Sequence, residues 1–529
     1  MYRKWRGSTL DVTSLSTLGR VLPADQATSV LSSEMSVRNM TSSPNKRALV
    51  AARSPVQGLP RRRLSFIPVF AQSVAAVAPS GGAAVVPVLV ISTAGGGGAL
   101  AAFVCAAVVI LLVSACLRPM AQRMASVGGI YSYTARGLGP TAAVPTGWSA
   151  IVGYATVGMA GLLAVGTYLS HIAVTSGLAR GTPTGAIVAV TVVAATVATL
   201  VMIRGIRISA WITLLVECVS IGLVGALLIL LLVTSTSSGA PVAAAMSWDG
   251  NAQSMALSVV VAVSAFVGFE SSTTLSGEAR QPFLTVPRVI RWTPVAAGAL
   301  YLIAVPVQAI VLADTPEAVR DSATPLVTLL VSEGSTGLSA ILDLGIAASF
   351  FACTLASVNA LVRVLFCKGR EGVAPAGLGH THPRFQTPAY AIAASMIVIT
   401  AVPIVVLLAG VSPDQGLRMF LTLAACGYIG SYITGCLSAP LLLRRIGEST
   451  PGVWVLGVLT TGILLFLVIN AVIFAVTDGL VLIAVYAAIM AGAVLYTLTL
   501  RRLAPHRLES VGIYDETQRT DLLPTVPFR

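Results

Sequence analysis

The sequence predicts an all-α integral membrane protein with about twelve transmembrane helices. Its composition is the first reason, because 56% of the 529 residues are hydrophobic and only 10% are charged, against about 25% charged in a soluble domain. The second reason is a series of apolar runs, each close to the roughly 20 residues that cross a bilayer as a helix. The third is that the basic residues gather in alternate loops, as the positive-inside rule requires.

The apolar runs divide the chain into a core domain and two tails. Residues 1–65 contain no run of spanning length and are rich in Ser, Arg and Pro, so we expect a disordered basic cytoplasmic tail. Residues 66–500 form the twelve-helix domain, and 501–529 form a C-terminal cytoplasmic tail. The predicted spans are 66–91, 95–117, 140–168, 184–203, 208–233, 254–275, 293–313, 338–366, 389–410, 416–440, 452–475 and 477–499.

The distribution of charge predicts the orientation of these spans. With both termini cytoplasmic, 30 of the 33 basic residues fall on the inner side, which explains the net charge of +13 by topology and not by nucleic-acid binding. The 3 lysines against 30 arginines suggest a high-GC bacterial genome, so we expect a multi-pass protein of the bacterial cytoplasmic membrane. Arg61, Arg62 and Arg63 adjoin the first span and could contact anionic lipid, although a simple positive-inside anchor explains them as well.

Known catalytic signatures are missing from the sequence. None of the three lysines stands in a phosphate-binding G-x-x-x-x-G-K-[ST] motif, the four histidines form no H-E-x-x-H, and no G-x-S-x-G is present. The seven cysteines form no C-x-x-C pair. We therefore expect no enzyme activity, no cofactor and no metal.

Three acidic residues lie well inside predicted spans, where a charged side chain costs about 2.5–3.5 kcal/mol on insertion scales; Asp478, at the start of the last span, counts with the outer loops. Asp343 is close to a helix end, which favours a structural role. Glu217 lies in the middle of the fifth span, and a proton site and a packing partner explain it equally well. Glu270 is the strongest candidate for function, because it lies where the sixth span is interrupted.

Two spans carry interruptions of their helical pattern. In the sixth span, residues 264–274 contain Gly268 and four consecutive hydroxyl residues; in the first, residues 78–83 contain Pro79 and two glycines. Interruptions at matching positions of two five-helix halves are typical of a transporter site. The amides that begin a half-helix can bind a carboxylate and the carbonyls that end one can bind an ammonium group or a cation, so a zwitterionic amino acid fits.

Three segments then resemble the amino acid permeases of the amino acid–polyamine–organocation superfamily. The first is Gly128–Tyr133, with Gly139-Pro140 and Gly147-Trp148. The second is Phe266–Glu270, with Glu278, Pro282 and Pro287-Arg288. The third is Ser357–Arg363, with Gly369–Gly372 and Thr387-Pro388. The resemblance covers about residues 66–500.

The resemblance implies a leucine-transporter-like fold, in which a five-plus-five inverted repeat with broken helices 1 and 6 is followed by two extra C-terminal helices. It also implies alternating access around a site at the middle of the membrane. Where the family often has Gly-Ser-Gly in the first helix, this chain has Pro79-Ser80-Gly81, followed by Gly82.

The site residues follow from the same resemblance. The carboxylate of the substrate would bind the amides of Ser80, Gly81 and Gly82. Its amino group would bind carbonyls near Val77, Ser264 and Val267. Gly268 lies in the break of the sixth helix. Phe266 and Phe269 would form the wall of the pocket for the substrate side chain. Further candidates for this pocket are Tyr154, Phe350 and Phe351, although aromatic residues at such positions are more often packing residues.

Coupling residues are the last expectation. Glu270 matches the glutamate of the family's sixth helix that is implicated in gating and proton sensing. Some relatives have a lysine in the fifth helix where sodium-driven relatives bind a cation. No lysine is predicted in any span here, so coupling would depend on a sodium ion or on a carboxylate, either Glu270 or Glu217. We favour proton coupling over sodium. Glu278 could close an inner gate by pairing with a loop arginine, and a solvated loop charge is an equal alternative.

Together these features predict a secondary active transporter that moves an amino acid across the cytoplasmic membrane by proton-coupled symport or antiport. A polyamine or organic amine transporter or exchanger of the same fold is the alternative. A different class, a membrane sensor that binds an amino acid without transporting it, has less support because neither tail has a domain-like apolar pattern.

Overall fold

The structure is a computed structural model that describes residues 58–175, 183–237, 242–248, 252–313, 315–316, 319, 324–332, 334–473 and 477–512. All of these belong to one unit of the chain, Pro55–Arg529. Most of the predicted N-terminal tail and residues 513–529 of the predicted C-terminal tail lie outside the described residues, so their disorder stays a prediction.

The described residues contain eleven helical segments that are long and apolar enough to cross a membrane. The first of them, Phe66–Ala121, has 56 residues and would be about 84 Å long as one straight helix, far more than the roughly 30 Å of a bilayer core. It is broken at Ala78 and again at Gly95, whose φ is 71°. It therefore holds the first two predicted spans, and the prediction of about twelve spans is confirmed.

Each predicted span falls on a helix, but several helices are longer than predicted: α12 begins at Pro282 and not at 293, and α7 ends at Thr175 and not at 168. The first half contains α4 (Phe66–Val77), α5 (Pro79–Ala121), α6 (Ile130–Gly137), α7 (Pro140–Thr175), α8 (Pro183–Arg204) and α9 (Ile206–Ser237). The second half contains α10 (Val242–Ala245), α11 (Ala252–Ser264), the 3₁₀ helix η2 (Phe269–Leu275), α12 (Pro282–Ala313), α14 (Pro325–Ser332), α15 (Thr336–Arg370), η3 (Ala376–Gly379), α16 (Ala389–Leu408) and α17 (Pro413–Arg445). The chain continues with α18 (Pro451–Ile473), α19 (Thr477–Leu503) and the short α20 (Pro505–Glu509).

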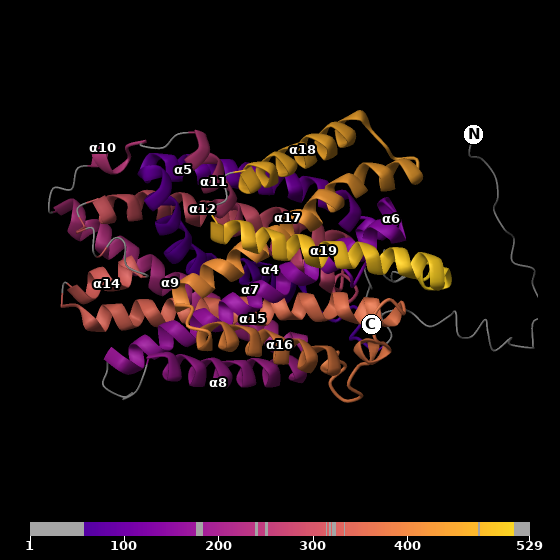
Figure 1. The fold of residues 1–529 in the computed structure, drawn as a ribbon, viewed down its shortest axis with the longest axis horizontal. Helices are drawn as coiled ribbons and strands as arrows, with labels where there is room; N and C mark the ends of the chain where they lie inside the picture. Colours follow the sequence, from indigo (N-terminus) through magenta and orange to yellow (C-terminus); the bar gives the residue numbers. More distant parts are fainter. Residues whose placement is uncertain are drawn as a thin grey trace, which may run out of the picture. The chain divides into compact units, whose positions relative to one another are not determined.

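The long helices run side by side along the horizontal axis of Figure 1. Helix α7 packs against α15 and α17 at the centre, while α5 packs against α11 and α12. The short helix α4 is enclosed by α9, α12, α15 and η2. This arrangement buries the two interrupted segments in the middle of the bundle.

The two ends of the bundle differ in charge. We call the end that carries α6, η3 and the loops with Arg123, Arg280 and Arg384 the arginine-rich end, and the end that carries α10 and α14 the opposite end (Figure 1). Both α10 and α14 lie in stretches that we expected to be loops, because neither has an apolar run of spanning length.

The bundle begins before the first span. Leu64 is buried and pairs with Ala279 in an isolated bridge, and the Leu64 amide donates to the Glu278 carbonyl at 2.9 Å. Arg62 Nη1 donates to the carbonyl oxygens of Ser276 and Gly277 at 2.9 and 3.2 Å. The last residues of the predicted tail therefore contact the loop that follows η2.

Lys368 and Arg363 lie on one helix. Arg363 is within the predicted span 338–366 and Lys368 follows it, but α15 continues to Arg370 and carries both as buried side chains. Lys368 Nζ donates to the Val144 carbonyl at 3.0 Å and lies over the rings of Tyr131 and Trp148. The expectation that no lysine lies in a span is therefore wrong. Lys368 is nevertheless far from the first interruption, because it is 18 residues, or about 27 Å of helix, beyond Phe350, whose ring contacts Gly81.

Candidate functional site

The first interruption separates α4 from α5 at Ala78. Ala78 adopts a left-handed conformation with φ 51° and ψ 58°, and Pro79 begins α5 at the position where a missing N–H costs nothing. Val77 is the last residue of α4, so its carbonyl group has no partner later in that helix. The break predicted from residues 78–83 is thus present, at its first residue.

A carboxylate from another helix lies at the start of α5. Glu217, in the middle of α9, accepts hydrogen bonds from the Ser80 amide at 3.2 Å and the Ser80 hydroxyl at 2.8 Å, both on Oε1. The side chain is buried, with 2% of its surface exposed. Because amides at a helix start carry partial positive charge, they stabilise this carboxylate.

Two further serines complete the contacts around Glu217. Ser349 of α15 donates to the two Glu217 oxygens at 3.1 and 3.0 Å and accepts from the Gly81 amide at 3.0 Å. Ser220 lies 2.8 Å from the Ser80 hydroxyl and donates to the Gly345 carbonyl. Sequence analysis missed both serines. Ser220 follows Glu217 by three residues and so lies on the same face of α9, which is a signal that the sequence contains. Ser349 is 132 positions from Glu217 on another helix, and no local pattern connects the two.

The second interruption lies between α11 and η2. Ser264 ends α11, and Gly268 has φ 93°, which favours glycine. A Cβ atom on Gly268 would lie 2.8 Å from the Ala76 carbonyl oxygen. The absence of a side chain therefore lets the second break touch the end of α4.

Two tyrosines hold Glu270 in the second break. Tyr154 of α7 donates to Glu270 Oε1 at 2.9 Å, and Tyr432 of α17 donates to Oε2. The Tyr432 hydroxyl also accepts from the Gly268 amide at 3.4 Å. Tyr154 was named as a pocket aromatic, but its hydroxyl binds Glu270; Tyr432 was missed.

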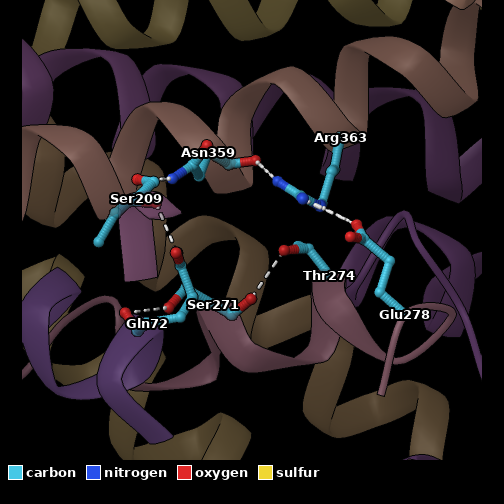
Figure 2. Close-up of polar contacts among 8 residues, drawn as sticks. Gln72, Ser209, Ser271, Thr274, Glu278, Asn359 and Arg363 are labelled. Carbon is cyan, nitrogen blue, oxygen red and sulfur yellow. Dashed lines mark hydrogen bonds and ion pairs between the residues drawn. The ribbon is translucent and has the colours of Figure 1, made fainter. Parts of the chain in front are cut away.

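Polar contacts join the two breaks toward the arginine-rich end. Ser73 of α4 donates to the Phe269 carbonyl, and Ser271 of η2 donates to the Gln72 carbonyl at 3.3 Å. The Gln72 side chain donates to the Ala356 carbonyl of α15 at 2.6 Å. Figure 2 shows Gln72 and Ser271 facing each other between the helices. The half-helix α4 is therefore tied to both η2 and α15.

A buried ion pair lies beyond these contacts. Arg363 donates from Nε and Nη2 to Glu278 Oε1 at 2.9 and 2.7 Å, and from Nη1 to the Asn359 carbonyl at 2.8 Å (Figure 2). Burial raises the pKa of the Glu278 carboxyl, and the Arg363 guanidinium opposes that rise. Glu278 is fully buried, so the alternative of a solvated loop charge is wrong, and its partner is a helix residue and not a loop arginine.

The aromatic residues predicted for one pocket pack against different neighbours. Phe266 packs at right angles on Tyr301, with 4.9 Å between ring centroids, and also against Phe103. Phe269 lies 5.8 Å from the ring of Tyr432. The ring of Phe350 lies against Gly81, since a Cβ atom there would be 3.1 Å from it. Phe351 is half-buried, and Val267 is buried beside Gly268.

A cavity opens at the opposite end of the bundle. It has a volume of about 170 Å³, and Ala84 of α5 and Ile346 of α15, each about one turn from the Glu217 contacts, are among its lining residues. A neighbouring cavity of about 310 Å³ shares Tyr168 and Asp414 with it. These two cavities lie toward the opposite end, and the buried pair of Arg363 and Glu278 lies toward the arginine-rich end.

Asp343 has a structural partner, as its position suggested. Its Oδ2 lies 2.6 Å from His171 Nδ1, and both residues line the cavity of about 310 Å³.

Sequence comparisons agree with the geometry. Residues 80–500 match the profile of the family described as amino acid permease, which covers most of the chain. The protein therefore belongs to the amino acid permease family, which three segments of its sequence resemble.

Individual relatives are more distant. An uncharacterized transporter of Mycobacterium tuberculosis (strain ATCC 25618 / H37Rv) is 29% identical over 275 residues, 51% of this chain and 57% of that protein. The low-affinity putrescine importer PlaP of Escherichia coli (strain K12) is 22% identical over 274 residues, 51% of this chain and 59% of that protein. The branched-chain amino acid permease BcaP of Bacillus subtilis (strain 168) is 28% identical over 125 residues, 23% of this chain and 26% of that protein. The chain thus spans less than two thirds of the length of these relatives.

Proposed function

We propose that the protein is a secondary active transporter that moves an amino acid, or a related amine, across the membrane by alternating access around the two breaks. The observation that supports this most is the placement of two interrupted helices side by side, each with a buried carboxylate. Half-helix ends at the middle of a membrane supply polar groups to a solute without exposing backbone to lipid.

The closed and open sides of the site supply the two gates. The pair of Arg363 and Glu278, with the Gln72 contacts, closes the arginine-rich side. The cavity at the opposite end leaves a route from that side. Release at the arginine-rich end would require α4 to separate from η2 and α15.

We propose proton coupling, with Glu270 and Glu217 as the groups that gain and lose the proton. Both are carboxylates held by hydroxyl or amide groups, and within the described residues neither forms an ion pair with a basic side chain. A carboxylate without a fixed cation can become neutral by protonation more readily than one that is paired.

Uptake into proteoliposomes tests this function. Purified protein is reconstituted with an imposed pH gradient, and accumulation of radiolabelled amino acids and amines is followed for the wild type and Glu270→Gln. We expect accumulation in the wild type that collapses when a protonophore is added, and loss of this pH-driven accumulation in Glu270→Gln. Glu448→Gln, which changes only an exposed pair with Arg123, is the matched control.

Other outcomes of this assay would contradict the proposal. Saturable binding without any flux would identify a sensor. Accumulation driven by a sodium gradient alone would exclude proton coupling. Wild-type behaviour of Glu270→Gln would remove Glu270 from the coupling mechanism.

The proposed orientation in a bacterial cytoplasmic membrane has its own test. With both termini cytoplasmic, the arginine-rich end faces inward. A cysteine introduced at exposed Ser449 should then resist a membrane-impermeant maleimide in intact cells, and one at Ser412 near the opposite end should react. The reverse pattern would invert the topology.

A further inference from the structure

A hollow on the surface of the bundle lies where α5 ends and α12 begins, at the arginine-rich end. It has a volume of about 270 Å³, and its lining includes Arg118 of α5 and both Arg288 and Arg291 of α12. The Ser114 hydroxyl of α5 donates to the Ile290 carbonyl of α12 at 2.9 Å, which joins the two helices about one turn from the hollow. The three arginines therefore surround one space.

These arginines have no anionic partner in the part of the chain that the structure describes. No acidic side chain lines the hollow there, and none of the three arginines forms an ion pair or a side-chain hydrogen bond with another described residue. Arg288 and Arg291 are exposed, and Arg118 is half-buried. Like charges around one space repel each other, so an anion placed between them would be stabilised.

The chemistry of the lining suits a phosphate group. The guanidinium group of arginine presents its N–H donors in a planar fork that matches the oxygens of a phosphate. Trp292 also lines the hollow with 52% of its surface exposed, and its ring centroid lies 5.4 Å from the Arg291 guanidinium carbon. Tryptophan is typical of the membrane–water interface, and basic pockets between spanning helices are typical of sites for anionic lipid headgroups.

Exposed apolar side chains continue from the hollow along both helices. They are Leu111, Val108 and Val104 of α5 and Val295, Leu302 and Ile303 of α12. Residues seven positions apart lie on the same face of a helix, so Leu111 is in line with Arg118. Val295 is likewise in line with Arg288. A soluble phosphate compound would use only the hollow, whereas a lipid would also cover these apolar faces with its acyl chains.

From these observations we infer that the hollow binds an anionic phospholipid. Its phosphate lies among Arg118, Arg288 and Arg291, and its acyl chains lie along the exposed faces of α5 and α12. In the proposed orientation this site faces the inner leaflet of the membrane. The inference goes beyond the proposed function, because the hollow lies on the outer surface of the bundle and contains no residue of the two breaks.

Quenching of tryptophan fluorescence tests the inference. The purified full chain is titrated in mixed micelles with phosphatidylglycerol brominated on its acyl chains, and separately with brominated phosphatidylcholine, which has no net charge. The emission of Trp292 is the difference between the wild type and Trp292→Phe. We expect phosphatidylglycerol to half-quench this emission at a mole fraction about tenfold lower than phosphatidylcholine.

Paired arginine variants connect this preference with the hollow. Arg288→Gln combined with Arg291→Gln should reduce the preference to about threefold or less. Arg384→Gln combined with Arg444→Gln removes the same charge from exposed positions of the arginine-rich end and should keep the wild-type preference. Arg288→Lys combined with Arg291→Lys retains the charge and should keep most of the preference, so it controls for damage to folding.

Several outcomes would overturn the inference. Equal quenching by the two lipids would mean that the arginines only anchor the helix ends at the interface. An equal loss in the two pairs of glutamine variants would indicate attraction by net charge and not a site. Displacement of phosphatidylglycerol by millimolar inorganic phosphate at constant ionic strength would identify a site for a soluble phosphate compound. If neither lipid quenches Trp292, another occupant, such as a second copy of the chain, covers this face.

Discussion

The two breaks hold their carboxylates in different ways. At the first break the acid comes from outside, since Glu217 of α9 lies on the start of α5 together with a serine of α15. At the second break the acid belongs to the broken segment, and Glu270 is held by tyrosines of α7 and α17. The first carboxylate therefore depends on contacts among α5, α9 and α15, while the second ties η2 to the central helices.

This difference suggests a division of labour. Glu217 lines a cavity that opens between α9 and α12, where Cys218 and Ala296 are exposed, and its oxygens bind hydroxyl and amide groups of two other helices. Glu270 lines none of the cavities described above, and both of its oxygens bind tyrosine hydroxyls. Protonation of Glu270 would therefore change its hydrogen bonds to α7 and α17. The predictions below test this difference.

The largest effect on stability should come from the ion pair beyond the second break. Arg363→Ala leaves the buried Glu278 charge without a partner and should lower the free energy of unfolding by about 3–5 kcal/mol. Adding Glu278→Gln should recover part of the loss. Denaturant titration in mixed micelles measures both.

Arg123→Ala is the control for this experiment. It removes an exposed pair with Glu448, which should cost about 1 kcal/mol or less. An equal loss in the two variants would contradict the role given to the buried pair.

The tyrosines at the second break should contribute next. Tyr432→Phe and Tyr154→Phe each remove one hydrogen bond to the Glu270 carboxylate, at a cost of about 1.5–3 kcal/mol each. Their combined loss should differ from the sum of the single losses because they share one acceptor. Denaturant titration in mixed micelles measures the three losses, and strictly additive losses would contradict the shared carboxylate.

Glycine at the second break should resist replacement. Gly268→Ala forces a side chain into φ 93° and within 2.8 Å of the Ala76 carbonyl oxygen, at a cost of about 1–3 kcal/mol. Gly222→Ala, on α9 with open space around it, should be neutral or stabilising. A neutral Gly268→Ala would mean that α4 and η2 do not touch as described.

The opposite replacement at the first break should give the smallest effect. Ala78 has φ 51°, a conformation that costs a residue with a side chain about 1–2 kcal/mol and glycine little. Ala78→Gly should therefore raise the free energy of unfolding by about 0.5–1 kcal/mol. A loss of stability would show that the turn does not strain Ala78.

Most of the fold could be predicted from the sequence, because an apolar run of spanning length identifies a helix and basic loops separate the spans. The bounds of α16 and α18 differ from the prediction by one or two residues. Lys368 was misplaced because α15 continues past its apolar run, and its ammonium group is satisfied by a carbonyl and two rings that are distant in sequence.

The site was predicted only in part. Pro79 and Gly268 marked the breaks, and a carboxylate in an apolar span marked Glu217 and Glu270. The polar residues Ser209, Thr213, Glu217 and Ser220 recur at helical spacing and mark the inward face of α9. The partners of Glu217 could not be predicted, because Ser80 and Ser349 belong to other helices. The neighbours of Phe266 and Phe350, Tyr301 and Gly81, likewise depend on helix rotations that no local pattern encodes.

Accumulation of radiolabelled amino acids and amines in proteoliposomes under an imposed pH gradient, measured for the wild type and Glu270→Gln, tests the central claim most directly. The account predicts accumulation in the wild type that a protonophore abolishes, and no pH-driven accumulation in Glu270→Gln. Equal pH-driven accumulation in the two proteins would contradict the role given to the second break.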